Sequence, residues 1–145
     1  MKKYQEKMKR ALELAIGEPV AFDGEAFETA DGRRFAVYTD AQATAAARRI
    51  IIGELWAFRS RFILEHSRCA DDFSERELDE AAAALEKIQG ELCESCGPLV
   101  RCLLSGRFDD FIDDAIDADG RGHFIATYDG QENEIEGGFF VYRLD

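Results

Sequence analysis

Apolar side chains recur at helical spacing along the first part of the chain. Over residues 2–16, Met8, Leu12 and either Ala15 or Ile16 fall on one stripe of a helix. The run Gly17-Glu18-Pro19 ends this pattern, because glycine and proline both interrupt helices. The sequence therefore predicts a first amphipathic helix over residues 2–16.

A second and longer apolar segment follows at residues 39–66. Thr39 and Gln42 have the spacing of a capping box, in which each side chain bonds a free backbone amide at a helix start. Between Ile50 and Ile63 the segment is apolar around most of the helical circumference, which is typical of a helix at the centre of a domain. We expect one helix running to about His66, with Trp56 buried.

Three further helices are predicted downstream. Ser74-Glu75-Arg76-Glu77 forms a second capping box and opens a helix through Ile88. Gly97-Pro98 precedes a short helix at 99–104, since proline suits a first helical turn. Residues 108–117 form another short helix with alternating apolar and acidic pairs.

Two pairs of segments contain residues that favour β-strands, and each pair predicts a hairpin. Residues 26–30 and 33–38 flank Asp31-Gly32, a pair that favours tight hairpin turns. Residues 123–128 and 139–143 are rich in aromatic and β-branched side chains and are expected to form a second pair of strands. The order of elements predicts an α+β fold, in which an antiparallel sheet of two hairpins is covered by several helices. The length of 145 residues is that of one domain, 1–145.

The net charge of the chain limits the classes of molecule that it is expected to bind. Eighteen basic and thirty acidic residues give a net charge of −12 and a pI near 4.6. Such a charge repels nucleic acid and anionic membranes, so we expect direct contact with neither. No apolar stretch is long enough to span a membrane or serve as a signal peptide, which predicts a cytoplasmic protein. Residues 107–136 carry two basic and ten acidic side chains, whereas residues 1–17 carry five basic and two acidic ones.

The acidic residues of the 108–117 helix fall on one face. At 100° per residue, the five aspartates occupy about 140° of the circumference, and Phe108, Phe111, Ile112, Ala115 and Ile116 occupy the opposite side. Five charges over eight rises of about 1.5 Å give one charge per ~2–3 Å, close to the ~1.7 Å axial spacing of duplex DNA. The simpler interpretation is a solvent-exposed face with no binding role. The functional interpretation is a surface that binds positively charged groups. The carboxylates that we expect to bind a partner are Asp109, Asp110, Asp113, Asp114, Asp117, Glu132, Glu134 and Glu136.

Two other chemistries are compatible with the sequence. His123, beside many carboxylates, is a candidate acid–base catalyst in a small enzyme, although a histidine in a strand is commonly structural. A zinc-stabilised module would use four ligands from an H-x-x-C and a C-x-x-C pair, but such spacing is also ordinary in helices. Those ligands would be His66, Cys69, Cys93 and Cys96. We expect no metal, no cofactor and no catalysis.

Several short motifs resemble small proteins encoded by bacteriophages and prophages. The motifs are Tyr38-Thr39-Asp40, Leu55-Trp56-Ala57-Phe58, Asp119-Gly120-Arg121-Gly122-His123-Phe124, Tyr128-Asp129-Gly130 and Phe140-Val141-Tyr142-Arg143. The resemblance covers residues 35–66 and 108–145 and implies a protein made by a mobile element in the cytoplasm of a bacterial host. It assigns no residue a role.

Small acidic phage proteins often act on host machinery with basic nucleic-acid grooves. We therefore expect a host-directed binding protein that inhibits a basic partner protein, such as an anti-CRISPR or antirestriction inhibitor that imitates DNA.

Overall fold

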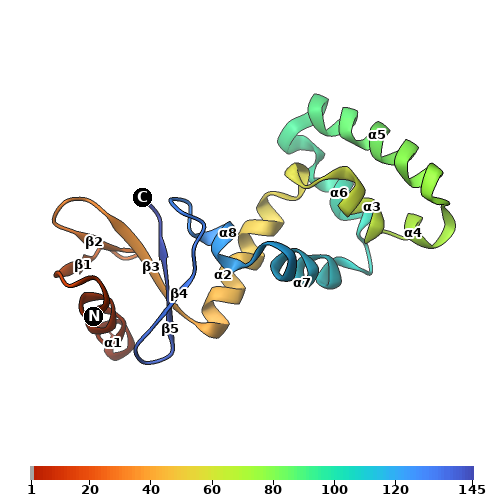
Figure 1. Ribbon diagram of the computed structural model, residues 1–145. Helices are drawn as coiled ribbons and strands as arrows, with labels where there is room; N and C mark the ends of the chain where they lie inside the picture. Colours follow the sequence, from red (N-terminus) through yellow and green to blue (C-terminus); the bar gives the residue numbers. More distant parts are fainter. Residues whose placement is uncertain (1) are drawn as a thin grey trace. The chain divides into compact units, whose positions relative to one another are not determined.

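The computed structural model describes residues 2–145, and the chain divides into two compact units (Figure 1). The first unit comprises Met1–Arg48 and Asp119–Asp145, and the second comprises Arg49–Ala118. One boundary falls inside helix α2 (Asp40–Gly53), and the other falls at the end of helix α7 (Phe108–Asp119). Division into compact units does not test cooperative unfolding, so the single domain over 1–145 stays a prediction.

The first unit contains a five-stranded antiparallel sheet, which confirms the predicted α+β fold. Its spatial order is β1-β2-β3-β5-β4. The predicted Asp31-Gly32 turn joins β2 to β3, with Gly32 at a φ of 89°. The strands are β1 (Val20–Phe22), β2 (Phe27–Thr29), β3 (Arg34–Thr39), β4 (Asn133–Ile135) and β5 (Phe139–Arg143).

Helix α1 (Lys3–Ile16) covers one face of this sheet, as the first apolar stripe predicts. Leu12 is fully buried, and Met8 packs in the same cluster as Val37 and Val141 of the paired central strands. Gly17 ends the helix with a φ of 77°, a conformation that glycine adopts without a steric penalty. The helix and the strands β3 and β5 thus share one apolar core.

Side chains of the central strands also point to the opposite face, because successive residues of a strand alternate. Tyr142 of β5 is fully buried there, and its ring lies 5.9 Å from that of Tyr38 of β3. The first half of α2 and the short helix α8 (Arg121–Ile125) lie on this side (Figure 1). The predicted Thr39–Gln42 capping box opens α2 through reciprocal hydrogen bonds of 3.0 and 3.2 Å.

The second unit is helical. Its core contains the fully buried side chains of Ile51, Ile63, Val100, Phe111 and Ile112. The Ser74–Glu77 capping box opens α5, and Pro98 lies in the first turn of α6, as predicted. The α-helices after α2 are α3 (Ser60–Glu65), α4 (Cys69–Asp72), α5 (Glu75–Leu92), α6 (Gly97–Leu103) and α7. Two short 3₁₀-helices, η1 (Leu55–Ala57) and η2 (Cys93–Cys96), lie before α3 and before α6.

The single helix expected over 39–66 is wrong. The chain leaves helical geometry after Gly53, and Phe58 has extended backbone angles. Gln89 of α5 donates its side-chain amide to the carbonyls of Trp56, at 2.9 Å, and Phe58, at 2.7 Å. A continuous helix would use those carbonyls for amides four residues on, so the tertiary contact replaces local bonds. Trp56 is half-buried in this break rather than fully buried.

The strand expected at 123–128 is also wrong, because residues 121–125 form α8. Gly120, with a φ of 83°, starts this helix, and Phe124 and Ile125 are buried by it. The partner of β5 at the sheet edge is instead β4, whose sequence Asn133-Glu134-Ile135 carries little β-branched or aromatic signal. Over residues 2–145 there is no helix with the length and apolar character needed to cross a membrane.

Asp23, in the turn between β1 and β2, gives a test by pH. The backbone amide of Ala26, then that of Glu25 and the Arg34 guanidinium, lower the pKa of the Asp23 carboxyl to about 2. A lowered pKa stabilises the fold above the unfolded value of 3.8, and this contribution is lost as pH falls toward 2. Asp23→Asn, which removes the charge, should be less stable than the wild type at pH 7 and nearly equal to it at pH 2. Melting curves that stay equally separated from pH 7 to 2 would contradict this role.

Candidate functional site

The acidic face predicted on residues 108–117 is present on α7. Asp109, Asp110, Asp113, Asp114 and Asp117 are all exposed, while Phe111, Ile112 and Ala115 are buried. Apolar burial therefore fixes which side of the helix faces solvent. The acidic-face geometry is confirmed, and its use in partner binding stays a prediction.

Some of these carboxylates already have contacts within the protein. Nε2 of His66 lies 2.7 Å from a carboxylate oxygen of Asp114, and Nδ1 lies 2.8 Å from the carbonyl oxygen of Phe62. Both ring nitrogens of His66 therefore contact acceptor oxygens. Asp109 and Asp113 also interact with other groups of the chain. The acidic face is thus exposed to solvent, although several of its carboxylates contact other groups of the same chain.

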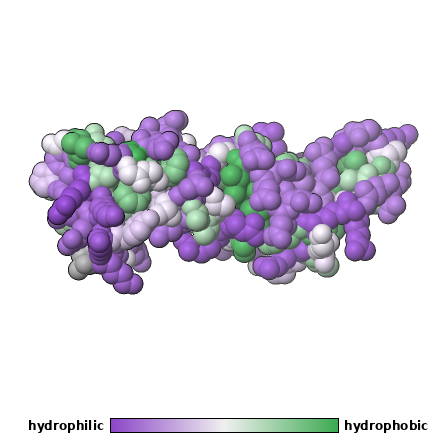
Figure 2. Space-filling view, turned by 90° about the horizontal axis from the view of Figure 1, so that it is seen from below, coloured by the Kyte–Doolittle hydropathy of each residue, from purple (hydrophilic) through white to green (hydrophobic). Residues whose placement is uncertain are grey.

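Three basic side chains of the second unit, those of Arg61, Arg76 and Arg107, form ion pairs with carboxylates. The unit holds eight basic and sixteen acidic residues, a net charge of −8. Arg61 pairs with Glu65, Glu75 and Asp79. Arg107, at the residue before α7, pairs with Asp71. Hydrophilic residues cover most of the surface seen in Figure 2.

The three glutamates of the expected binding set belong to the first unit. Glu134 and Glu136 are exposed near the β4–β5 turn. Glu132 instead accepts hydrogen bonds from Arg121 Nε, at 2.8 Å, and from the Tyr142 hydroxyl. Glu132 therefore has a structural role inside this unit that the sequence analysis did not anticipate.

Arg121 is the centre of that internal cluster. Its side chain is only 12% exposed, and its Nη1 donates to Asp40 Oδ1 at 2.8 Å, to the Asp40 carbonyl at 3.0 Å and to Thr44 Oγ1 at 3.2 Å. The guanidinium also lies over the Phe140 ring, 4.8 Å from its centroid. Burial opposes the charged form of Arg121, but the bonds to Glu132 and Asp40 outweigh burial and raise the pKa of the guanidinium.

Four of the five motifs on which the predicted resemblance rests meet around this cluster, and Leu55-Trp56-Ala57-Phe58 belongs to the second unit. A Cβ atom at Gly122 would lie 2.7 Å from the carbonyl oxygen of Gly130, so the two motifs touch through backbone. The Arg143 guanidinium lies 3.7 Å from the Tyr128 ring centroid, and the Tyr128 amide bonds the Arg143 carbonyl. Packing and charge pairing hold these residues together. The signal that could have revealed the cluster is a single arginine between two glycines at the start of an apolar run.

Among residues 2–145, the side chains of the zinc alternative are not grouped as a metal site, and the catalytic role of His123 stays a hypothesis. His123 is exposed on α8, its ring 5.0 Å from that of Phe124, and no described carboxylate pairs with it. Over residues 2–145, no three side chains among His, Cys, Asp and Glu are grouped to hold a metal ion. His66, Cys69, Cys93 and Cys96 therefore do not form a four-ligand set, and Cys96 is buried while Cys93 is exposed.

Comparisons with protein-family models, curated proteins and solved structures give no match to the chain. The resemblance to phage proteins stays a prediction from the sequence motifs.

Tyr142 provides a spectroscopic test of the cluster. Burial, followed by the hydrogen bond to Glu132, raises the pKa of the Tyr142 phenol well above its usual value of 10.0. An ordinary phenol is about nine-tenths ionised at pH 11. We expect the wild type and Tyr142→Phe to show the same rise in absorbance at 295 nm up to pH 11 while both stay folded. An extra tyrosine titrating near pH 10 in the wild type would disprove the buried pair.

Gly122→Ala tests the close backbone contact. The new Cβ would lie 2.7–2.8 Å from backbone atoms of Gly130, Gln131 and Glu132, closer than atoms pack. Urea denaturation should show a loss of about 1–3 kcal/mol or more, as for other overpacked sites. Gly90→Ala is the control, because its Cβ meets nothing within 4 Å in helix α5 and should stabilise by about 0.5–1 kcal/mol. Equal effects of the two substitutions would contradict the steric argument.

Proposed function

We propose that this protein is an acidic binding protein whose α7 face docks on a basic, nucleic-acid-binding surface of a partner protein. The observation that carries the proposal is the segregation over residues 108–117 of α7, where five exposed aspartates lie opposite the buried Phe111, Ile112 and Ala115. The interaction is electrostatic, so complementary potential speeds association and aligns the two surfaces.

Two further observations support this function. The second unit has a net charge of −8, and α7 places its charges at a spacing of ~2–3 Å, comparable to the phosphate charges of a duplex. A partner with a basic groove would meet this face in place of nucleic acid. The motif resemblance gives the proposal its biological setting, a phage- or prophage-encoded protein that counters host defence in the bacterial cytoplasm.

The variant Asp110→Asn with Asp117→Asn tests the face. These two aspartates are chosen because Asp109, Asp113 and Asp114 have contacts within the chain. A tagged wild type should capture from bacterial lysate a basic protein that duplex DNA or high salt releases, since exposed charge pairs are screened by salt. The double variant should capture several-fold less and keep its melting temperature, because the apolar side of α7 is unchanged.

The matched control is Glu86→Gln with Glu91→Gln, which removes two exposed charges from α5. This control should bind as the wild type does. Equal capture by the wild type, the α7 variant and the control would exclude the α7 face as the binding surface. Capture that DNA does not compete with would exclude a basic nucleic-acid-binding surface as its target.

A further inference from the structure

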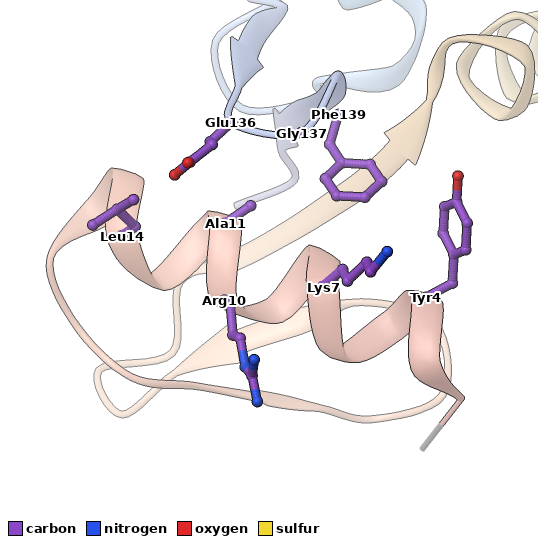
Figure 3. Close-up of a pocket in the computed structure, with 8 residues that line it drawn as sticks. All are labelled: Tyr4, Lys7, Arg10, Ala11, Leu14, Glu136, Gly137 and Phe139. Atoms are coloured by element: carbon purple, nitrogen blue, oxygen red, sulfur yellow. The ribbon is translucent and has the colours of Figure 1, made fainter.

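A groove of about 380 Å³ lies in the first unit between α1 and the turn that joins β4 to β5 (Figure 3). This volume is in the range of ligand-binding clefts, about 300–1,000 Å³. Ala11 and Gly137 contribute little side-chain bulk to it. The larger side chains that line the groove are Tyr4, Lys7, Arg10, Leu14, Glu136 and Phe139.

Apolar side chains in the groove remain open to solvent. Tyr4 is 56% exposed and Leu14 is 71% exposed, although both belong to a helix whose Met8 and Leu12 are buried against the sheet. The Tyr4 ring meets the edge of the Phe139 ring, with centroids 5.8 Å apart. The core does not need Tyr4 or Leu14, so they offer contact area to another molecule.

The same groove carries unpaired positive charge. Lys7 and Arg10 are exposed, and neither forms an ion pair with any described residue. By contrast, Arg33, Arg34 and Arg121 of the same unit are all paired with carboxylates. Residues 1–17 hold five basic and two acidic side chains in a chain of net charge −12. The groove therefore complements an anion.

The geometry of the groove favours an elongated ligand. From Tyr4 to Leu14, ten helical rises of about 1.5 Å make about 15 Å, which an extended peptide covers with roughly five residues at ~3.3 Å each. Figure 3 shows Glu136 at the Leu14 end, whereas Lys7 points toward the space beside Tyr4 and Phe139. A bound peptide would thus place its carboxylates at the Lys7 end, away from Glu136.

We propose that this groove binds a short, extended, acidic peptide segment of a partner protein, with an apolar side chain next to its carboxylates. The apolar side chain packs on Tyr4 and Phe139, and the carboxylates pair with Lys7 and with Arg10, whose exposed side chain points away from Phe139 in Figure 3 and would rotate toward the ligand. The net charge of the first unit, −4 from ten basic and fourteen acidic residues, does not prevent this. At physiological salt, exposed charges farther away than about 8 Å are largely screened, so the local cations dominate.

The test uses two capped pentapeptides, Asp-Glu-Leu-Phe-Ser and its reverse order, together with counterparts in which Asn and Gln replace the acidic residues. Each is titrated into the full chain labelled with ¹⁵N. We expect an acidic peptide to shift backbone amides of residues 4–14 and 136–139. The neutral counterparts should bind about five- to tenfold more weakly, since two exposed ion pairs are lost.

Variants separate the groove from general charge effects. Lys7→Gln with Arg10→Gln should weaken binding of the acidic peptide about five- to tenfold. The control, Arg76→Gln with Lys87→Gln, makes the same charge change on exposed positions of α5 and should bind as the wild type does. Leu14→Ala should weaken both acidic and neutral peptides, because it removes apolar contact only.

Four outcomes would overturn the proposal. These are the absence of shifts, shifts outside the groove, equal binding of acidic and neutral peptides, and unchanged binding by the groove variant. Vesicles of phosphatidylserine and phosphatidylcholine are a further arm. If they perturb these amides while the peptides do not, the groove is a membrane-contact surface instead. None of these results depends on the α7 face, which is tested by different variants.

Discussion

A nearly buried guanidinium has to be paired, and Arg121 imposes this requirement on the first unit. Its acceptors come from the start of α2 and from Glu132 before β4, while Glu132 also holds Tyr142 of β5. Three segments that are remote in sequence therefore meet at one charge. Removing one of these partners leaves the largely desolvated guanidinium with fewer acceptors, which is destabilising. The sheet, α2 and α8 take their mutual positions from this cluster as well as from apolar packing.

Ion pairs within the protein also determine which charged side chains remain available to contact another molecule. Arg61, Arg107 and Arg121 are all committed to carboxylates within their own units. Helix α7 contains aspartates and no basic residue, so its solvent-facing side is negative, whereas α1 carries exposed cations. A single net charge of −12 hides two surfaces of opposite sign that belong to different units.

Local patterns were sufficient where local chemistry determines the structure. Both capping boxes, the Asp31-Gly32 turn and the two faces of α7 follow from residues a few positions apart. Prediction failed where a remote side chain overrode the pattern. Gln89 takes backbone carbonyls that a helix over 39–66 would have used, and burial of Phe124 within the short α8 replaced an apparent strand. The Arg121 cluster was missed because its partners lie eleven to eighty-one residues away.

The pairing of β3 with β5 has a consequence for the order in which the chain is made. Val37 pairs with Val141, so the central ladder of the sheet joins segments roughly a hundred residues apart. At synthesis rates of about 5–20 residues per second, β3 waits roughly 5–20 s for its partner. During that interval the backbone groups on one side of β3 are open to any other strand. The nascent chain is therefore most prone to strand mispairing while the second unit is being synthesised. Pairing of β5 with β3 then occupies the open backbone groups.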